Sequence, residues 1–461
     1  MDREINNRWT RSGCRPKVAL VRPYVNRRRL YGWYSLLGSH EPPLGILYIA
    51  SYLATHGIDA TILDGEQLGS TRLIAMLTNL RPEIVGVSAS TFSFGIAATL
   101  SARIRDILPN ALIVMGGPHV SALPIDSLSR VPALDGCVVG EGEHTLLEIA
   151  KGTNPDAITG LVWRANAEDF RGGLARRPLA DLDQIELDWS LLDGFPAAYR
   201  PGWQDRGMGQ TASLVASRGC PFGCTFCAGS EVHGTVRRAH SPRYIVCTMA
   251  RLHNSYGIRS VYFHDDNFAQ SRAWLHEFCT TLRGSGLPIR WSCACRAESL
   301  DVDTLLLMRS AGCYQIGVGV ESSSQEILDH MCKGTTVRAI TEGIRRIHAS
   351  GLMTKAYLII GTPTERIRDM KKTLAFAVKS GVAHIQVSYF TPLPGSPAFK
   401  ERWASEAEWS KMNLLSPSRT SRFPRSFLRC MELGFYAACY GRRMITGSGH
   451  TAVQHNHAGN G

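Results

Sequence analysis

Long apolar runs are missing from this sequence. No run of about 18 apolar residues occurs, which predicts that the chain has no membrane span. Residues 1–17 lack the apolar core of a secretory signal. The 461 residues include 13 cysteines, an odd number that does not suit a disulfide framework in a long chain without such a signal. We therefore expect a cytoplasmic protein with reduced thiols, some of which bind a metal.

An excess of charge is missing from the middle of the chain. The net charge is +12, and nearly all of the excess lies in residues 1–29 and 401–461. Basic ends can contact nucleic acid or anionic lipid, but solvated tails are the more common case, so nucleic acid is not expected as a partner. The sequence also offers no Ser/His/Asp triad and no paired carboxylates, so we expect the chemistry to depend on cofactors.

Two runs of alternating strands and helices fill most of the chain. The first run has strand patterns at 17–25, 59–65, 83–90, 111–117 and 133–143. The second run has strand patterns at 212–219, 259–267, 289–295, 314–321, 355–361 and 384–390. This alternation predicts an α/β protein: a doubly wound, Rossmann-like parallel sheet, followed by a partial (β/α)6 barrel or a second wound sheet. In both architectures, ligands bind at the carboxyl ends of the strands.

The stretch SRGCPFGCTFCAGS, residues 217–230, directly follows the first strand of the second run. It places Cys220, Cys224 and Cys227 on one short loop. Structural zinc sites close four positions, usually with paired CxxC spacings, but only one CxxC is present here, with His233 as the nearest further ligand. An iron–sulfur cluster normally takes four cysteines, so three leave one iron open to a substrate or cofactor. The spacing favours a catalytic cluster, with zinc or ordinary core thiols as the alternatives.

CxxxCxxC after the first strand of a βα run resembles the signature of the radical S-adenosylmethionine (SAM) enzymes. Later segments agree with it: HDDNF (264–268), GVGVES (317–322), LIIGTPTE (358–365) and YFTPLPGSPAF (389–399). The resemblance implies that Cys220, Cys224 and Cys227 bind a 4Fe–4S cluster whose open iron binds SAM. It also implies SAM contacts from Phe226, Asp265, Asp266, Asn267, Arg296, Glu321 and Gly361.

Simpler interpretations of some of these residues stay open. Asp265 and Asp266 can cap the helix that follows them, and Glu321 can be the partner in a buried ion pair. A further pair, Cys293 and Cys295, is expected to share one face of a strand. Most thiols outside the triplet are expected to be ordinary core or surface residues.

The first run resembles the cobalamin-binding domain of the cobalamin-dependent radical SAM enzymes. Such domains often carry an SxL motif, and VSAST (87–91) occupies the corresponding position here. GGPH (116–119) contains the GG that these domains carry on the next strand, and GEGE (140–143) lies at the end of the last strand pattern. Glycines there let backbone amides approach a phosphate closely. The resemblance implies cobalamin contacts from Ser88, Ser90, Thr91, Gly116, Gly117, His119, Gly140, Glu141, Gly142 and Glu143.

One part of the cobalamin pattern is absent. The DxHxxG segment that usually supplies a histidine ligand of cobalt is missing after the first strand, where the loop reads RPYVNRRRLYGWYS. His119 can then either ligate cobalt or simply position its turn. A flavodoxin-like domain without a cofactor is the alternative for the whole first run.

As a whole, the resemblance implies a cobalamin-dependent radical SAM methyltransferase that methylates an unactivated carbon of a small molecule. In that family, one SAM methylates the cobalamin, and a second yields a 5′-deoxyadenosyl radical that removes hydrogen from the carbon to be methylated. Proximity of cofactors and substrate replaces acid/base groups. An electron donor of the flavodoxin or ferredoxin type is also implied. The implied domains are a basic tail (1–16), a cobalamin-binding domain (17–152), a linker (153–210), a radical SAM domain (211–400) and a substrate-side extension (401–461).

Three other functions stay open at this point. A cobalamin-dependent oxidative cyclase or rearrangement enzyme, similar to the anaerobic porphyrin-ester cyclase, would use the same cofactors. An RNA-modifying radical SAM enzyme would use the basic ends to hold RNA. A corrinoid carrier without enzymatic activity would leave the cysteine triplet without a purpose.

Overall fold

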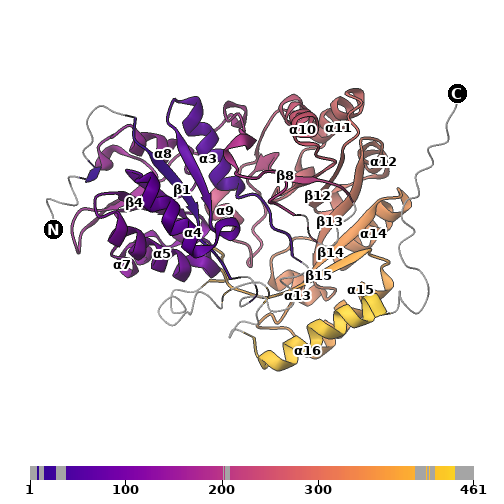
Figure 1. Cartoon of the computed structure of the whole chain (residues 1–461). Coiled ribbons are helices and arrows are strands. Elements are labelled where there is room, and N and C mark those ends of the chain that lie inside the picture. The colour runs from indigo at the N-terminus through magenta and orange to yellow at the C-terminus, as the bar shows by residue number, and fades with distance from the viewer. Residues whose placement is uncertain are drawn as a thin grey trace.

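A computed structural model describes residues 8–9, 15–26, 28, 38–200, 202, 208–399, 412, 415 and 421–441. Most of the predicted basic tail 1–16 and most of the predicted extension 401–461 lie outside the described residues. Two large sheets, one in each half of Figure 1, form the framework of the molecule, with helices packed against them and a further sheet of two short strands. Among the described residues, no helix is long and apolar enough to cross a membrane.

The N-terminal sheet has the strand order β2-β1-β3-β4-β5-β6-β7. Its parallel strands are β1 (Val18–Arg22), β2 (Ala60–Asp64), β3 (Ile84–Ser88), β4 (Leu112–Gly116) and β5 (Gly136–Val138). The helices of this half are α3 (Leu44–Thr55), α4 (Gly65–Leu80), α5 (Phe94–Ile107), α6 (Pro118–Ala122), α7 (Pro124–Arg130) and α8 (Glu143–Ala150). The order 2-1-3-4-5 is that of a doubly wound sheet, which confirms the predicted fold of this half.

Helices cover both faces of this sheet because its strands are apolar on both sides. In β1, Val18 and Leu20 belong to one apolar cluster, whereas Ala19 and Val21 belong to another. Successive side chains of a strand point to opposite faces, so the two clusters are the two layers of a wound sheet. The cluster that contains Val18 and Leu20 continues into the second half of the molecule, so the two halves share one core.

The region predicted as a linker contributes to this sheet. Strands β6 (Leu161–Arg164) and β7 (Phe170–Gly172) extend the sheet in antiparallel fashion beyond β5. Further on, the short turns η4 (Leu182–Gln184) and η5 (Trp189–Leu191) bury Leu182 and Trp189 in the shared core. The two strands are too short to show an alternating pattern, so periodicity does not reveal them.

The second sheet is entirely parallel, in the order β15-β14-β13-β12-β11-β8. Its strands are β8 (Thr211–Leu214), β11 (Ser260–Phe263), β12 (Arg290–Cys295), β13 (Cys313–Glu321), β14 (Met353–Ile360) and β15 (His384–Tyr389). Its helices are α10 (Pro242–Tyr256), α11 (Arg272–Gly284), α12 (Val302–Ser310), α13 (Gln325–His330), α14 (Val337–Ala349) and α15 (Ile367–Lys379). These elements form the predicted partial barrel (Figure 1).

Local sequence sets the ends of these helices. The hydroxyl of Ser241 accepts a hydrogen bond from the Tyr244 amide at the start of α10, and Gly257 ends the helix in the left-handed conformation at a φ of 67°. Helix α16 (Arg425–Tyr436) then covers the edge of the barrel sheet. There the hydroxyl of Tyr436 accepts the amide hydrogen of Val387 on β15 at 3.2 Å. An edge strand thereby has a backbone donor satisfied by a side chain.

Candidate cofactor site at the facing strand ends

The cysteine loop follows β9 (Ser217–Arg218) and ends at the short helix α9 (Gly229–His233). The amide of Gly229 donates to the Cys227 sulfur at 3.4 Å, and the Cys227 amide donates to the Cys224 carbonyl at 3.1 Å. The three thiols therefore lie on one turn, at whose end a backbone amide donates to sulfur. A thiolate that accepts an amide hydrogen bond is a common feature of metal–sulfur sites.

Cations lie near the thiols. Burial raises the pKa of the Cys224 thiol, whereas the charges of Lys333 and Arg296 act to lower it. Burial also raises the pKa of Cys220 and of Cys227. Since only thiolates ligate metal, these cations favour the ligating form of the sulfur atoms.

The far side of the loop is anchored to the barrel. Thr225 donates its amide to Met331, and its carbonyl accepts the amide of Ala398, at 2.9 and 2.8 Å. Phe226 packs in a small apolar cluster with Met331 and Phe390. The predicted SAM contact Phe226 therefore also holds the loop in place.

Asp265 and Asp266 hold the strand and loop that lead to the cysteines. Asp265 is buried and accepts hydrogen bonds from the Ala216 amide at 2.8 Å and from the Ser217 hydroxyl at 2.5 Å. Burial raises its pKa to about 6. Asp266 accepts from the Gly219 amide at 3.3 Å and lies 3.3 Å from Nδ1 of His233. Both carboxylates thus hold the backbone around the cysteine loop.

Asn267 follows them and is also buried. Its side-chain oxygen has no hydrogen-bond partner within the part of the chain that the structure describes. A buried polar oxygen without a partner is costly in a finished fold. Of the three adjacent residues predicted to contact SAM, Asn267 is therefore the one whose oxygen is open to a ligand donor.

Glu321 and Arg296 reach the same edge of the barrel sheet. Glu321 follows a register shift in β13, has a positive φ of 59°, and forms a buried ion pair with Lys333 at 2.9 Å. A non-glycine residue in this conformation carries strain of the kind found at ligand sites. Arg296 donates to Glu298 at 2.8 Å and to the Lys333 carbonyl at 2.7 Å.

Gly361 ends β14 with a φ of 82°. Its amide donates to Glu365 at 2.6 Å, and burial raises the pKa of Glu365 to about 7. Only glycine adopts this conformation without strain. The predicted adenine contact is therefore a turn that a buried carboxyl group holds, and the turn brings backbone close to the edge of the sheet.

The donor set at the loop fits an iron–sulfur cluster. Three thiols on one turn, an amide hydrogen bond to sulfur and nearby cations supply what such a cluster needs, and three cysteine ligands would leave the fourth iron open to SAM. Among the described residues, no three His, Cys, Asp or Glu side chains come together as a site for a single metal ion. His233, the alternative zinc ligand, is paired with Asp266.

The carboxyl edge of the N-terminal sheet is built from small residues. Gly117 has a φ of 108°, and a Cβ at this position would lie 2.5 Å from the Ala89 carbonyl oxygen. The Ser90 hydroxyl lies 2.9 Å from the Ser93 hydroxyl, which begins a turn before α5. Ser88 and Gly116 end adjacent strands in register, and Thr91 is buried. Two neighbouring strand ends thus offer backbone and hydroxyl groups, which fits the phosphate and amide groups of a corrinoid.

His119 lies inside the helical layer. Its ring is fully buried at 4.2 Å from the ring of Phe94, and burial lowers its pKa to about 4. A fully buried ring that packs against Phe94 favours the turn-positioning role over contact with cobalt.

The GEGE turn reaches across to the cysteine loop. Glu143 binds Arg218 at 2.8 Å, and Glu141 binds Arg238 of β10 (Arg238–Ala239) at 2.6 Å and Arg218 at 3.3 Å. Arg218 also lies over the ring of Tyr48 at 4.8 Å. The two carboxylates predicted to contact cobalamin are therefore bound to arginines of the other half.

The rest of the turn and its arginine partners complete this contact. Gly140 has a φ of 76° and donates its amide to the Ser121 hydroxyl at 3.0 Å, and Gly142 precedes α8. Sequence analysis did not find Arg218 and Arg238. The one feature of the sequence that could have indicated Arg218 is its place two positions before the first cysteine, and Arg238 has no such feature.

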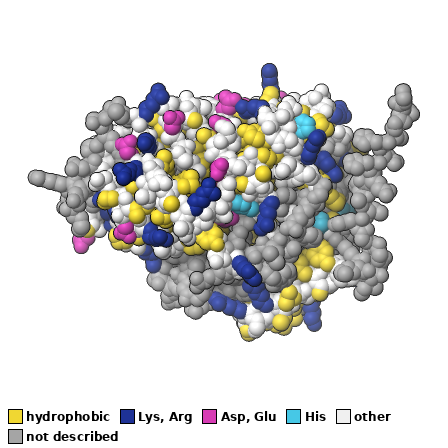
Figure 2. Space-filling model, viewed as in Figure 1, with side chains coloured by type: hydrophobic (Ala, Val, Ile, Leu, Met, Phe, Trp, Pro, Cys, Tyr) yellow, Lys and Arg dark blue, Asp and Glu magenta, His cyan; other side chains and the backbone are white. Residues whose placement is uncertain are grey.

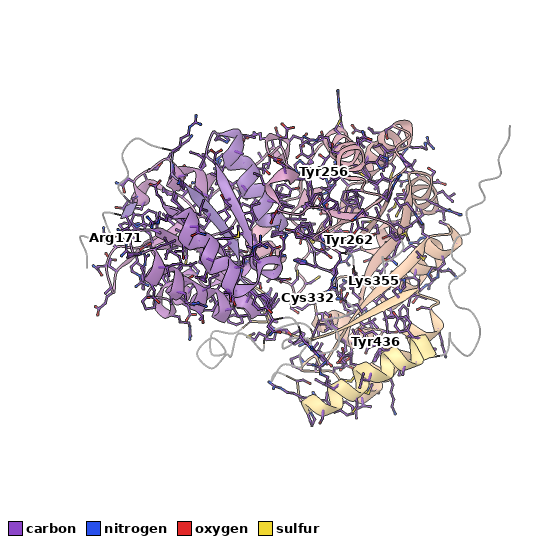
Figure 3. The ribbon with its side chains drawn as sticks, in the orientation of Figure 1. Arg171, Tyr256, Tyr262, Cys332, Lys355 and Tyr436 are labelled. Carbon is purple, nitrogen blue, oxygen red and sulfur yellow. The ribbon has the colours of Figure 1, made fainter. Side chains whose placement is uncertain are left out.

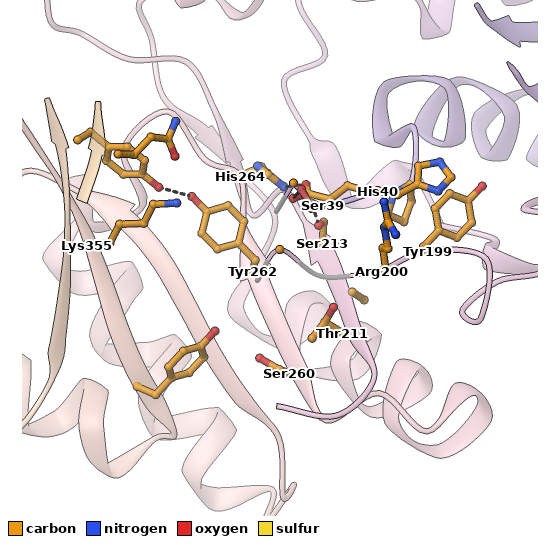
Figure 4. A pocket seen from close by; sticks show the side chains of 18 of the residues that line it. Ser39, His40, Tyr199, Arg200, Thr211, Ser213, Ser260, Tyr262, His264 and Lys355 are labelled. Carbon is orange, nitrogen blue, oxygen red and sulfur yellow. Dashed lines mark hydrogen bonds and ion pairs between the residues drawn. The ribbon is translucent and has the colours of Figure 1, made fainter. Parts of the chain in front are cut away.

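A cavity of about 560 Å³ lies between the two halves (Figure 4), and Figure 3 labels three of the residues that line it: Tyr262, Lys355 and Tyr436. On one side it is lined by residues 38–42, from the loop after β1, and on the other by the inner face of the barrel. His264, which precedes Asp265, contributes to the wall and forms an ion pair with Glu41. The cavity therefore adjoins the segment that holds the cysteine loop.

Fold and site together define a class of protein: α/β enzymes in which a wound sheet faces a half-barrel with a three-cysteine loop at the shared edge. Residues 36–150 match the family of the B12 binding domain, and residues 214–377 match the radical SAM superfamily. The chain therefore belongs to the radical SAM enzymes that carry a B12-binding domain. Its cofactors are cobalamin, SAM and the 4Fe–4S cluster of radical SAM chemistry.

Similar proteins cover most of this chain. An uncharacterized methyltransferase of Pyrococcus horikoshii is 28% identical over 87% of this chain and 89% of that protein. The anaerobic magnesium-protoporphyrin IX monomethyl ester cyclase of Cereibacter sphaeroides is 28% identical over 82% of this chain and 63% of the cyclase. The structure of the radical S-adenosylmethionine methyltransferase TsrM from Kitasatospora setae has a TM-score of 0.69 at 19% identity, covering 85% of this chain and 76% of TsrM, which is a likeness of fold.

Proposed function

We propose that this protein is a cobalamin-dependent radical SAM methyltransferase that acts on an unactivated carbon of a small molecule. The observation that supports the proposal is the contact between the two cofactor edges, in which Glu141 and Glu143 of the N-terminal half bind Arg218 beside the cysteine loop. When bound, the cluster and SAM supply a carbon radical, and cobalamin supplies the methyl group. The chain itself encloses the substrate between them and excludes water, which such chemistry requires.

Within this function, the described residues hold the cofactor edges in place. Asp265 and Asp266 hold the approach to the cysteine loop, and Glu141, Glu143 and Arg218 fix that loop against the N-terminal sheet. We infer that Asn267, Arg296, Glu321 and Gly361 take the SAM contacts, since these residues lie along the same carboxyl edge. The cobalamin contacts are proposed for the backbone at Gly116, Gly117 and Gly140 and for the hydroxyls of Ser88, Ser90 and Thr91.

The test is the ratio of products. Anaerobically reconstituted protein should bind about four irons and one cobalamin, and with substrate and a reductant it should form S-adenosylhomocysteine and 5′-deoxyadenosine in equal amounts. Protein that carries zinc and no corrinoid would contradict the proposal.

An oxidative cyclase is the second candidate, because one relative that covers most of this chain carries that name. It would form 5′-deoxyadenosine without S-adenosylhomocysteine, so the same measurement separates the two functions. An RNA-modifying function has less support, since Figure 2 shows acidic and basic side chains interspersed on the face that it displays.

We also propose an electron donor of the flavodoxin or ferredoxin type and a cytoplasmic location. The chemistry needs a one-electron reductant, and no disulfide joins the twelve cysteines that the structure describes. Reduction of the cluster by purified flavodoxin, followed by electron paramagnetic resonance, tests the first point. Fractionation of the cells that express the protein tests the second.

A further inference from the structure

The barrel side of the cavity carries a lysine whose charge no described residue neutralises. In β14, residues 353, 355, 357 and 359 are half-buried and alternate with buried residues, so Lys355 and Tyr357 share the face that lines the cavity. The Lys355 amine lies 5.0 Å from the centre of the Tyr357 ring. Within the described part of the chain, it makes no hydrogen bond and no ion pair. Figure 4 shows this amine directed toward Tyr262.

The remaining charges of the cavity do not compensate this lysine. Glu41 is the single carboxylate among the described lining residues, and it is already paired with His264. Burial acts to raise the pKa of the Glu41 carboxyl group. The hydrogen bond and the charge of His264 outweigh burial, so that the pKa of Glu41 is lowered to about 2. Arg200 adds a second cation to the wall. The cavity thus has a net positive charge, and an opposite charge at about 4 Å is strongly favoured where water is partly excluded.

Hydroxyl groups stand beside the amine. The hydroxyls of Tyr262 and Tyr357 lie 3.1 Å apart, so one donates to the other and the acceptor keeps its own hydrogen free to donate. Burial raises the pKa of Tyr262 well above its usual value, which keeps this phenol protonated. A cation with a neighbouring phenol donor is an arrangement that binds carboxylate or phosphate oxygens.

From the cavity, the unpaired lysine and the phenol pair, we propose that the substrate is a small anionic molecule whose carboxylate or phosphate binds Lys355 and the Tyr262–Tyr357 pair. This inference rests on the proposed function and specifies its substrate class. Lys355 lies near the start of β14, whereas Gly361 follows the end of this strand. At about 3.3 Å per residue, the two residues are about 20 Å apart along the strand direction. The anionic end is therefore held inside the barrel, and the rest of the molecule extends toward the strand ends where the cofactors bind.

The experiment measures binding of two probes, benzoate and phenyl phosphate, to the reconstituted holoenzyme by saturation-transfer difference NMR. The variants are K355M, which removes the charge at similar length, and K355R, which keeps it. K371M removes an exposed lysine of α15 and is the matched control. K355Q replaces K355M if the methionine variant melts at a lower temperature than the wild type.

At least one probe should bind to the wild type, K355R and K371M, and about tenfold more weakly to K355M or K355Q. A preference for benzoate indicates a carboxylate substrate, and a preference for phenyl phosphate indicates a phosphate. Absence of binding to the wild type, or equal binding to K355M, would overturn the inference.

Failure of the proposed function has a different signature. Slow cleavage of SAM to 5′-deoxyadenosine without substrate reports on the cofactor sites, and it should be the same in K371M and in the wild type, because Lys371 is an exposed residue of α15. If probes bind as expected but the protein retains neither iron nor cobalamin, the anion site stands and the methyltransferase proposal fails. If the cofactors bind and SAM is cleaved but no probe binds, only the anion site fails.

Discussion

The carboxyl edges of the two sheets face the same space but are made of different groups. At the N-terminal sheet, the strand ends carry small residues such as Ser88, Gly116 and Gly117, which offer backbone and hydroxyl groups. At the barrel sheet, the strand ends carry Asp265 and Glu321, whose charges are largely bound by other protein groups. One edge is built to receive a large cofactor along its backbone, and the other is built to hold a reactive loop rigidly.

The charged residues of the N-terminal edge support the same distinction. Glu141 and Glu143 form ion pairs with Arg218, which lies two residues before the first cysteine of the loop. A buried ion pair adds little net stability but fixes geometry, because breaking it leaves a buried charge. The contact therefore sets how the cluster stands relative to the N-terminal edge, and the comparison between the edges can be tested residue by residue.

The largest expected effect is at the cysteine loop. Changing Cys220, Cys224 or Cys227 to Ala should abolish 5′-deoxyadenosine formation, because the cluster loses a ligand, while cobalamin stays bound to the other edge. Iron analysis, the corrinoid absorption spectrum and chromatography of nucleoside products measure this. Cys247→Ala, at an exposed thiol of α10, is the control and should keep full activity. SAM cleavage that persists in a triplet variant would break the assignment of the cluster.

The next effect is on the ion cluster between the edges. Arg218→Met should lower the free energy of unfolding by about 3–5 kcal/mol, because Glu141 and Glu143 lose a buried partner. Urea denaturation measures the loss. Arg251→Met, in an exposed pair with Glu186, should cost about 1 kcal/mol or less. Equal costs for the two variants would show that the contact between the halves is not a buried one.

The free energy of unfolding should depend on pH through Glu365, the buried carboxyl group that accepts the amide hydrogen of Gly361. The folded-state pKa of Glu365, about 7, lies above its unfolded value, so its stabilising contribution is complete below about pH 4.5 and is lost as the pH rises through 7. Relative to Glu365→Gln, the wild type should therefore lose about 2–3 kcal/mol between pH 4.5 and 7. Denaturant unfolding at a series of pH values measures the difference. A constant difference across this range would show that Glu365 does not titrate there.

The smallest effect is expected at Glu41, which joins the loop of the N-terminal sheet to the barrel. This pair with His264 is partly exposed, so Glu41→Gln should lower stability by about 1 kcal/mol or less. Thermal unfolding measures it, with Glu168→Gln at an exposed position as the control. A loss of several kcal/mol would mean that this contact, and not the Arg218 cluster, holds the two halves together.

The sequence predicted the architecture well because its signals are local. Strand and helix periodicity gave both sheets and their helices, and CxxxCxxC with its following segments gave the family that the matched domains confirm. Strands β6 and β7 were missed, since they are short and pair with strands already in place. The pair Cys293 and Cys295 lies buried in the barrel core, as expected for ordinary thiols on one strand face.

The roles of single side chains were harder to predict. Glu141 and Glu143 follow a glycine-rich turn and therefore suggest ligand contacts, but the arginines that bind them are about 75 and 97 positions further along the chain. Lys355 gave no signal at all, since an alternating strand places many polar residues on a cavity face. Their assignment to cofactors or substrate stays a prediction for the experiments above.

The amino-acid sequence by itself determined that two wound units, a three-cysteine loop and glycine-rich strand ends exist, because periodicity, turns and ligand spacing depend on neighbouring residues. Only the tertiary structure decided that Arg218 joins the two carboxyl edges, and that Lys355 points into a cavity on the inner face of the barrel without a carboxylate partner among the described residues. Charge pairing is a property of distance in space, and residues that are far apart in the chain acquire it only when the sheets pack.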